Sequence, residues 1–384
     1  MNMPPPPGGW PNQPPGPTPG QPQYGPPTGQ QPYAGQQPYA PQAHWPQQPP
    51  PPPPPKGGGA IKWLLVAIAV LLVIGVTIGA TLLFTRGNGD GPSSPPTSGN
   101  ASDIASANDT GPVSIITEEP TCKAFLRVND ALADLQTKGW SENRGELGPR
   151  AEWTPEERTQ VESVATALRN AADQVEPLVA QTPHRVVREL YVQFAGYGRA
   201  YANSIDDYTP ADDNFASANV NASSALVGIC NSIEYGAITR ALTLNGATAP
   251  SSLAPVTSGL GAQLFVTDYN DVCNSWTQRE RAFIAENAPW ETLDPNTPAT
   301  DWSPQQRQIQ DDAEARMTNL ATAMEQDGRS SGNPELEDFA VLGALYLRAY
   351  AAAGDSYNNA DSWLSFAGLR LNNMIGSACD AAKK

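Results

Sequence analysis

Few residues in this 384-residue sequence have the types and spacing that enzyme chemistry requires. The histidines are His44 and His184, and His44 lies in a proline-rich segment, so a Ser-His-Asp or Cys-His arrangement would have to use His184. No HExxH, P-loop or EF-hand pattern occurs, and no GxGxxG follows a strand pattern. The sequence therefore predicts a protein that is not an enzyme, with no catalytic residue, no metal site and no cofactor.

A pair of carboxylates is the remaining catalytic option. Asp206-Asp207 and Asp212-Asp213 are close in the sequence, and glycoside hydrolysis needs two acids near each other. Asp212 follows a proline turn, however, and Asp361 follows an asparagine turn in the same way. An acid in the first turn of a helix is favoured by the helix dipole. We interpret these acids as structural, and a carboxylate-dependent cell-wall hydrolase stays as an alternative.

The cysteines are the other reactive side chains, and they are Cys122, Cys230, Cys273 and Cys379. Their spacing is too wide for a compact zinc motif of the CxxC kind. All of them follow the long apolar segment described below, and an even number outside the cytosol is typical of disulfides. The sequence therefore predicts disulfide bonds.

The C-terminal part contains an internal repeat. Trp153-Thr-Pro-Glu-Glu-Arg158 returns as Trp302-Ser-Pro-Gln-Gln-Arg307, an offset of 149 residues. Cys230 and Cys379 keep this offset, while Cys122 and Cys273 differ from it by two residues. An offset held over so many residues indicates a duplication, with one copy in residues 118–235 and the other in 268–384.

The sequence pattern of each copy predicts four helices. Apolar residues at spacings of three and four predict the first helix, from Cys122 to Lys138, and alternation of the strand kind is scarce. Thr154 and Glu157 form the pattern of a capping box, with a proline at the first helical position. In the first copy, the second helix is expected from Thr154 to about residue 181 and the third at about 183–207. The fourth is expected from Thr209 to Cys230. We therefore predict an all-α fold of two tandem four-helix bundles.

The bundle geometry favours one pairing of the cysteines. In an up-down-up-down bundle, the start of the first helix and the end of the fourth lie at the same end. We therefore expect Cys122–Cys230 and Cys273–Cys379, one disulfide in each copy. Sequence cannot fix connectivity, and Cys122–Cys379 with Cys230–Cys273 stays open.

Residues 236–267 join the copies and are rich in small residues, with Leu253, Val256 and Phe265 among the apolar residues expected to pack across the seam. A ligand groove between the copies is a further possibility. Its walls would be aromatic, formed by Trp140, Trp290, Trp276 and Tyr269. Such a groove would suit an envelope lipid or glycan.

The N-terminal part contains one candidate membrane span. Residues Trp63 to Phe84 include no charge and would reach about 33 Å as a helix, enough to cross a hydrocarbon core of about 30 Å. Lys56 and Lys62 precede the span and only Arg86 follows it closely, so the N-terminus is expected in the cytoplasm. The length of the run and its distance from the N-terminus favour a retained signal-anchor over a cleaved signal.

The segments around the span have other compositions. Residues 1–59 are rich in Pro, Gln, Gly and Tyr and are expected to form a disordered cytoplasmic tail, followed by the transmembrane helix in 60–86. Residues 87–117 have the composition of a flexible linker. The net charge of −16 is the sum of +3 in residues 1–86 and −19 after them, and so acidic a domain argues against a nucleic-acid partner.

The N-terminal composition (PPPPGGW, GQQPYAGQQPYA and PPPPPPPKGGG, then the span) resembles that of actinobacterial, particularly mycobacterial, proline-rich single-pass membrane proteins. This resemblance covers residues 1–86 and implies a cell-membrane location with an extracytoplasmic C-terminal domain. We expect an accessory or scaffold protein of the cell envelope that binds a protein partner. The alternatives are an envelope lipid or glycan carrier and the carboxylate-dependent hydrolase. The sequence does not indicate an oligomeric state.

Overall fold

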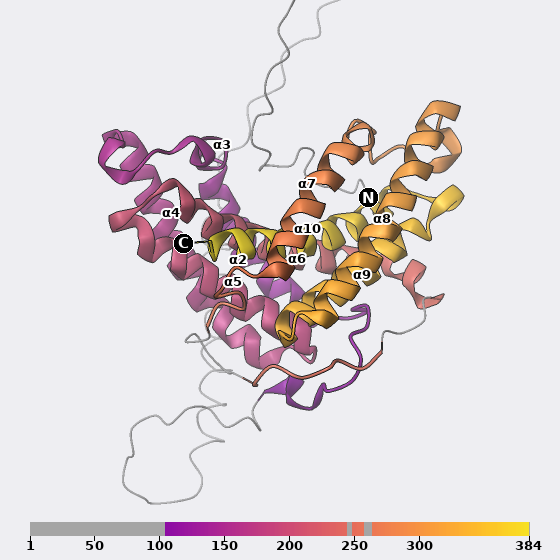
Figure 1. Cartoon of the computed structure of the whole chain (residues 1–384), viewed down its shortest axis with the longest axis horizontal. Helices are drawn as coiled ribbons and strands as arrows, with labels where there is room; N and C mark the ends of the chain where they lie inside the picture. The colour runs from indigo at the N-terminus through magenta and orange to yellow at the C-terminus, as the bar shows by residue number, and fades with distance from the viewer. Residues whose placement is uncertain (1–103, 244–247, 257–262, 384) are drawn as a thin grey trace, which may run out of the picture. The chain divides into compact units, whose positions relative to one another are not determined.

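The computed structural model describes residues 104–243, 248–256 and 263–383 (Figure 1). The expected cytoplasmic tail, the transmembrane helix with its span from Trp63 to Phe84, and residues 87–103 of the expected linker lie outside the described residues. Within the described part of the chain, every helix is too short or too polar to traverse a lipid bilayer.

The described residues form helices and contain no strand, which confirms the predicted all-α class. We call residues 104–235 the first half and residues 263–383 the second half. The α-helices of the first half are α2 (Cys122–Gln136), α3 (Trp140–Asn143), α4 (Pro155–Gln181), α5 (Arg185–Ser204) and α6 (Asp213–Glu234). Those of the second half are α7 (Asp271–Glu291), α8 (Pro304–Ser330), α9 (Pro334–Ala351) and α10 (Ser362–Ala381).

Short 3-10 helices lie before and between these α-helices. They are η2 (Ala105–Asn108), η3 (Arg144–Glu146), η4 (Arg150–Glu152), η5 (Ile205–Asp207), η6 (Pro210–Asp212), η7 (Ala237–Thr243), η8 (Ala299–Asp301), η9 (Gly354–Ser356) and η10 (Asn359–Asp361). The break between α2 and α3 occurs at Gly139, whose φ of 98° is a left-handed conformation that glycine adopts without strain. In the second half α7 continues without such a break.

The longest helices begin where the sequence predicts. In α4 the Thr154 side chain accepts a hydrogen bond from the Glu157 backbone N–H, and the Glu157 side chain accepts one from the Thr154 N–H, which completes a capping box. Ser303 and Gln306 form the same arrangement at α8. Both helices are 27 residues long, and α4 ends at Gln181, where the sequence predicts its end.

Both predicted disulfides are present. Cys122 is bonded to Cys230 and Cys273 to Cys379, with Cα–Cα distances of 5.5 and 5.3 Å. Each disulfide joins the first residues of one α-helix to the last turns of another, α2 to α6 and α7 to α10. The expected within-half pairing is therefore confirmed.

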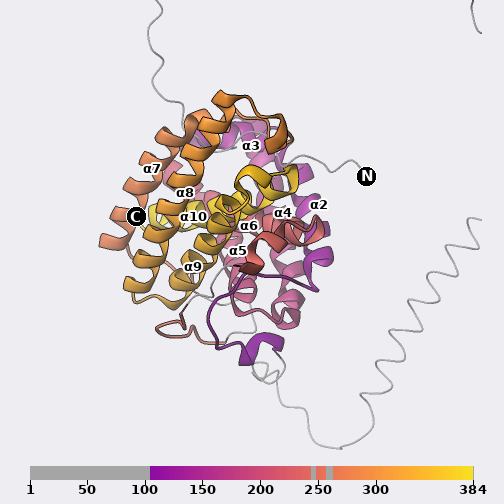
Figure 2. The ribbon, with the colours of Figure 1, turned by 90° about the vertical axis from the view of Figure 1, so that its right-hand side faces the viewer.

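Helices α6 and α10 form the main contact between the halves and lie side by side in the middle of both views (Figures 1 and 2). A Cβ atom added to Gly228 of α6 would lie 2.9 Å from the backbone of Ala367 of α10, so glycine permits this close approach. Nearby, Arg370 donates to the Asn221 side chain at 3.2 Å. These two residues are 149 positions apart, which is the offset of the sequence repeat.

Replacing Gly228 by alanine is expected to destabilise the protein by about 1–3 kcal/mol, because backbone atoms must move to admit the methyl group. At an open site in a helix the same change would stabilise by up to about 1 kcal/mol. Gly145 is such a site, with no atom within 4 Å of an added Cβ. Urea unfolding of Gly228→Ala beside Gly145→Ala measures the difference, and equal stabilities would contradict the close packing of α6 on α10.

The connecting segments differ from the expectations in two places. Residues 104–117, assigned to the linker, begin the folded part, because Ile104, Val113 and Ile116 are buried. In the segment between the halves, Phe265 is buried against Tyr197 of α5 and Phe339 of α9, as expected for a residue at the seam. Leu253 and Val256 are exposed instead, so their predicted packing across the seam is wrong.

Candidate functional site

The carboxylates considered as catalytic candidates make separate local contacts. The side chain of Asp206 is 93% exposed, whereas Asp212 is buried and accepts from the Thr209 backbone N–H and hydroxyl, both at 2.8 Å, which caps η6. Asp213 pairs with the buried Arg144. Burial raises the pKa of Asp213, and the Arg144 guanidinium lowers it in part. The structure therefore gives these acids positions in turns, caps and an ion pair.

Asp361 has the equivalent position in the second half and also caps a 3-10 helix, η10. It is 1% exposed and accepts from Nε and Nη2 of Arg240, at 3.1 and 3.2 Å. Arg240 belongs to η7, in the segment that joins the halves. The polar contact of Asp361 therefore fixes the connector to the second half.

The four aromatic residues expected to line a groove lie in different surroundings. Trp140 is buried in the first half and donates from Nε1 to the Tyr201 hydroxyl at 3.1 Å. Trp290 donates to the Tyr350 hydroxyl at 3.0 Å, and Trp276 is buried with its Nε1–H bonded to the Asn372 carbonyl. Tyr269 is partly exposed under the Lys383 ammonium. The buried rings of Trp140 and Trp276 offer no surface to a ligand in this conformation, and the groove stays a prediction.

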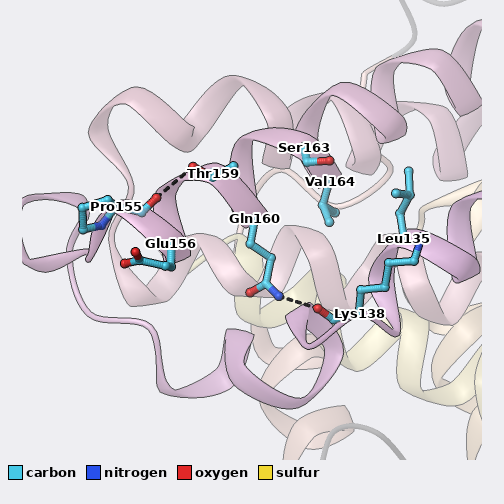
Figure 3. A pocket seen from close by; sticks show the side chains of 8 residues that line it. All are labelled: Leu135, Lys138, Pro155, Glu156, Thr159, Gln160, Ser163 and Val164. Carbon is cyan, nitrogen blue, oxygen red and sulfur yellow. Dashed lines mark hydrogen bonds between the residues drawn. The ribbon is translucent and has the colours of Figure 1, made fainter.

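A hollow of about 500 Å³ lies elsewhere, between the end of α2 and the first turns of α4 (Figure 3). Leu135 and Val164 give it apolar lining, and Lys138, Glu156 and Gln160 give it polar lining. Gln160 donates to the Lys138 carbonyl at 2.7 Å, which joins the two helices at this place (Figure 3). None of the four aromatic residues lines this hollow.

A set of charged side chains lies where the first turns of α5 and α9 meet. We call it the junction cluster, and it consists of the buried Arg185, Arg188 and Glu189 of α5 with the buried Asp338 and the half-buried Glu335 of α9. Arg185 is 3% exposed and donates from Nε and Nη2 to the Asp338 carboxylate, at 2.6 and 3.1 Å. Arg188 donates to Glu189 at 3.2 Å. The cluster therefore joins the two halves through ionised and hydrogen-bonded side chains.

Neighbouring segments enclose the junction cluster. Asp109, just after η2, accepts from the Arg185 backbone N–H at 2.7 Å, and its carbonyl accepts from the Arg185 guanidinium. Gln193 of α5 donates to Glu335 at 2.7 Å and accepts from the Phe265 backbone N–H at 3.1 Å. The segments that begin each half thus contact the same cluster.

Burial changes the pKa of two carboxyl groups of the junction cluster, Glu189 and Glu335. It raises the pKa of Glu189 well above its usual value, and the nearby Asp338 and Glu335 carboxyls raise it further. Burial also raises the pKa of Glu335 to about 7, against the lowering effect of the Gln193 hydrogen bond and Arg188. Carboxyl groups of this kind hold protons near neutral pH, which an exposed glutamate does not.

The sequence analysis did not identify the junction cluster. Glu189 and Asp338 are both acidic and are 149 positions apart, so the repeat offset contained a signal for them. The charged residues of Arg185–Ser204 also interrupt an apolar pattern, and all of Arg185, Arg188 and Glu189 are buried. Among the described residues, no group of three or more His, Cys, Asp or Glu side chains is placed to hold a metal ion.

Comparison with known proteins gives the family. An uncharacterised protein of Mycolicibacterium smegmatis (strain MKD8) is 42% identical over 348 residues, which are 89% of this chain and 91% of the relative. No solved structure matches the chain. Residues 104–383, which include every residue that the structure describes, match the family described as "Mycobacterial ESX-1 associated protein". The chain belongs to this mycobacterial ESX-1 associated family.

Proposed function

We propose that this protein is a non-enzymatic accessory protein of a secretion-related system in the mycobacterial cell envelope, held in the membrane by the segment from Trp63 to Phe84. Membership of the ESX-1 associated family supports the link to secretion. In this proposal residues 104–383 act outside the cytoplasm by binding a protein partner, and residues 1–59 remain inside.

The observation that carries the location is the pair of disulfides. All the cysteines follow the apolar segment, and the described structure leaves none of them as a free thiol. Disulfides persist in oxidising compartments and are reduced in the cytosol. A signal-anchor with its N-terminus in the cytoplasm would deliver this domain to the oxidising side, in agreement with the bonded cysteines.

The contacts that the repeated residues make support a binding function over a catalytic one. Trp140 and Tyr201 pack edge-to-face in the first half, and Trp290 and Tyr350 do the same in the second half. We propose that the halves are duplicated four-helix bundles, because the repeated caps, aromatic pairs and disulfides all serve internal contacts. In this proposal a fold that is built twice from such contacts offers its outer helix faces to a partner.

Affinity capture from the native membrane tests the binding function. The full-length protein and a version lacking residues 1–55 would be recovered in parallel, and the eluates analysed by proteomics and lipid mass spectrometry. We expect a reproducible envelope protein partner with both versions, because the partner binds the extracytoplasmic domain. Recovery of a bound lipid or glycan without any protein would contradict the proposal and favour the carrier. Loss of the partner with the tail would place the contact in the cytoplasm instead.

The location has its own test. A membrane-impermeant, thiol-reactive label would be added to intact cells with the disulfides left oxidised. We expect the variant Asp206→Cys to react, since the Asp206 side chain is 93% exposed and the domain is outside, while a cysteine introduced at Gln13 of the tail should be protected by the membrane. The opposite labelling pattern would contradict the proposed orientation.

A further inference from the structure

The junction cluster does not have enough positive charge for its acids. Glu189, Glu335, Asp338 and the adjoining Asp109 bring four carboxyl groups to the two guanidiniums of Arg185 and Arg188. The side chains of Glu189 and Asp338 are only 4% and 1% exposed, so water does not solvate these two carboxyl groups. Asp109 is 34% exposed and Glu335 is half-buried, so full ionisation would leave two net negative charges next to the buried pair.

The contact between Glu189 and Asp338 is a place where a proton can be held. The two carboxyl groups lie within hydrogen-bonding reach of each other, and they form such a bond only when one of them carries a proton. Asp338 already accepts two hydrogen bonds from Arg185, which favour its ionised form. Oε2 of Glu189 is buried and meets no other donor among the described groups. Glu189 is therefore the proton donor of the pair.

The other charged groups around the cluster have their own partners, so they do not compensate the charge of Glu189 in place of this proton. Glu337 on the same turns of α9 points to Arg329 of α8, with Nη1 and Oε1 at 3.0 Å. His184, next to Arg185, is bonded to the Glu118 carbonyl. The segment 263–266, which packs on α5 and α9, has no charged side chain. The charges that face Glu189 are thus Arg185, Arg188, Asp338 and Glu335, with Asp109 beyond Arg185.

We propose that the shared proton between Glu189 and Asp338 makes the junction of the two halves a pH-dependent contact, tight at mildly acidic pH and weakened as the pH rises. Loss of the proton places two carboxylates in contact at the first turns of α5 and α9, and their repulsion separates these turns. The device needs only residues of the described domain, so it does not depend on the proposed partner or location.

The direction of the pH effect follows from linkage. A carboxyl whose pKa is higher in the folded than in the unfolded protein stabilises the fold below its unfolded pKa, and this stabilisation is lost as the pH rises through the folded value. Burial raises the pKa of Glu189 well above its usual value, and it raises the pKa of Glu335 to about 7, so the loss of stability extends to neutral pH. Glu280, between α7 and α10, adds to the global effect because burial raises its pKa to about 8.

Hydrogen exchange of the full-length protein at pH 6 and pH 8 tests the proposal, with protection factors corrected for intrinsic exchange. In the wild type we expect protection of the first turns of α5 and α9 to fall as the pH rises. In Glu189→Gln the fall should be smaller by about tenfold or more, since the amide donates a hydrogen bond at both pH values and one pKa unit corresponds to a tenfold change. The contribution of Glu280 is the same in both proteins and cancels in the comparison.

Glu162→Gln is the matched control, because the Glu162 carboxylate is 49% exposed and pairs with Arg150 at the surface. This variant should keep the wild-type pH profile. Equal pH profiles for Glu189→Gln and the wild type would overturn the proposal. Loss of protection in Glu189→Gln already at pH 6 would overturn it too, because the neutral side chain would then not be the native form.

Discussion

Replacing Cys273 and Cys379 together by alanine is expected to lower the free energy of unfolding by about 4–5 kcal/mol. The bond closes a loop with a sequence separation of 106 residues, and a crosslink over that length removes about this much chain entropy from the unfolded state. Guanidinium unfolding of the oxidised protein beside the variant measures the effect. The denaturation midpoint should move to lower denaturant concentration.

The disulfide of the first half provides the matched comparison. Cys122→Ala with Cys230→Ala opens a loop of separation 108, so the expected loss is the same within error. Dithiothreitol reduces both disulfides of the wild type. This should lower the free energy of unfolding by at least as much as the larger of the losses in the two variants. A loss below about 1 kcal/mol in both variants would show that each half is held by its packing alone and would contradict this prediction.

Asp338→Ala is expected to lower the free energy of unfolding by about 3–5 kcal/mol, because it leaves the buried Arg185 guanidinium without its main partner. The remaining carboxylate, Asp109, is 3.8 Å away and partly exposed, so it compensates only in part. The change also relieves Glu189 of a negative neighbour, and the pKa of Glu189 should fall. The pH dependence of stability near neutrality should therefore become shallower in the same variant.

Asp355→Ala is the control for this change. It breaks the ion pair with Arg307, in which the side chains are 90% and 38% exposed, and pairs of this kind contribute little. Urea unfolding of both variants at pH 7 would give the comparison. If Asp338→Ala were as stable as Asp355→Ala, the Arg185–Asp338 contact would not hold the halves together.

The predicted and observed structures agree where the decisive interactions are local. The capping boxes at Thr154 and Ser303 involve residues three positions apart, and they begin α4 and α8 as expected. The disulfide pairing followed from the repeat and from the fact that an even number of antiparallel helices returns the chain to the end where it began. These features could be derived from spacing because each depends on a short range of residues or on a regular pattern.

The sequence by itself determined the helical class, the caps and the paired cysteines. Only the tertiary structure decided which polar residues are buried together. Arg185 and Asp338 are 153 residues apart, and Asn221 and Arg370 are 149 apart, so no local pattern predicts that they meet. It also decided that Leu253 is exposed while Phe265 is buried, although both belong to one connector. Burial and charge pairing arise from the packing of whole helices, α5 on α9 and α6 on α10, and this packing is a property of the assembled chain.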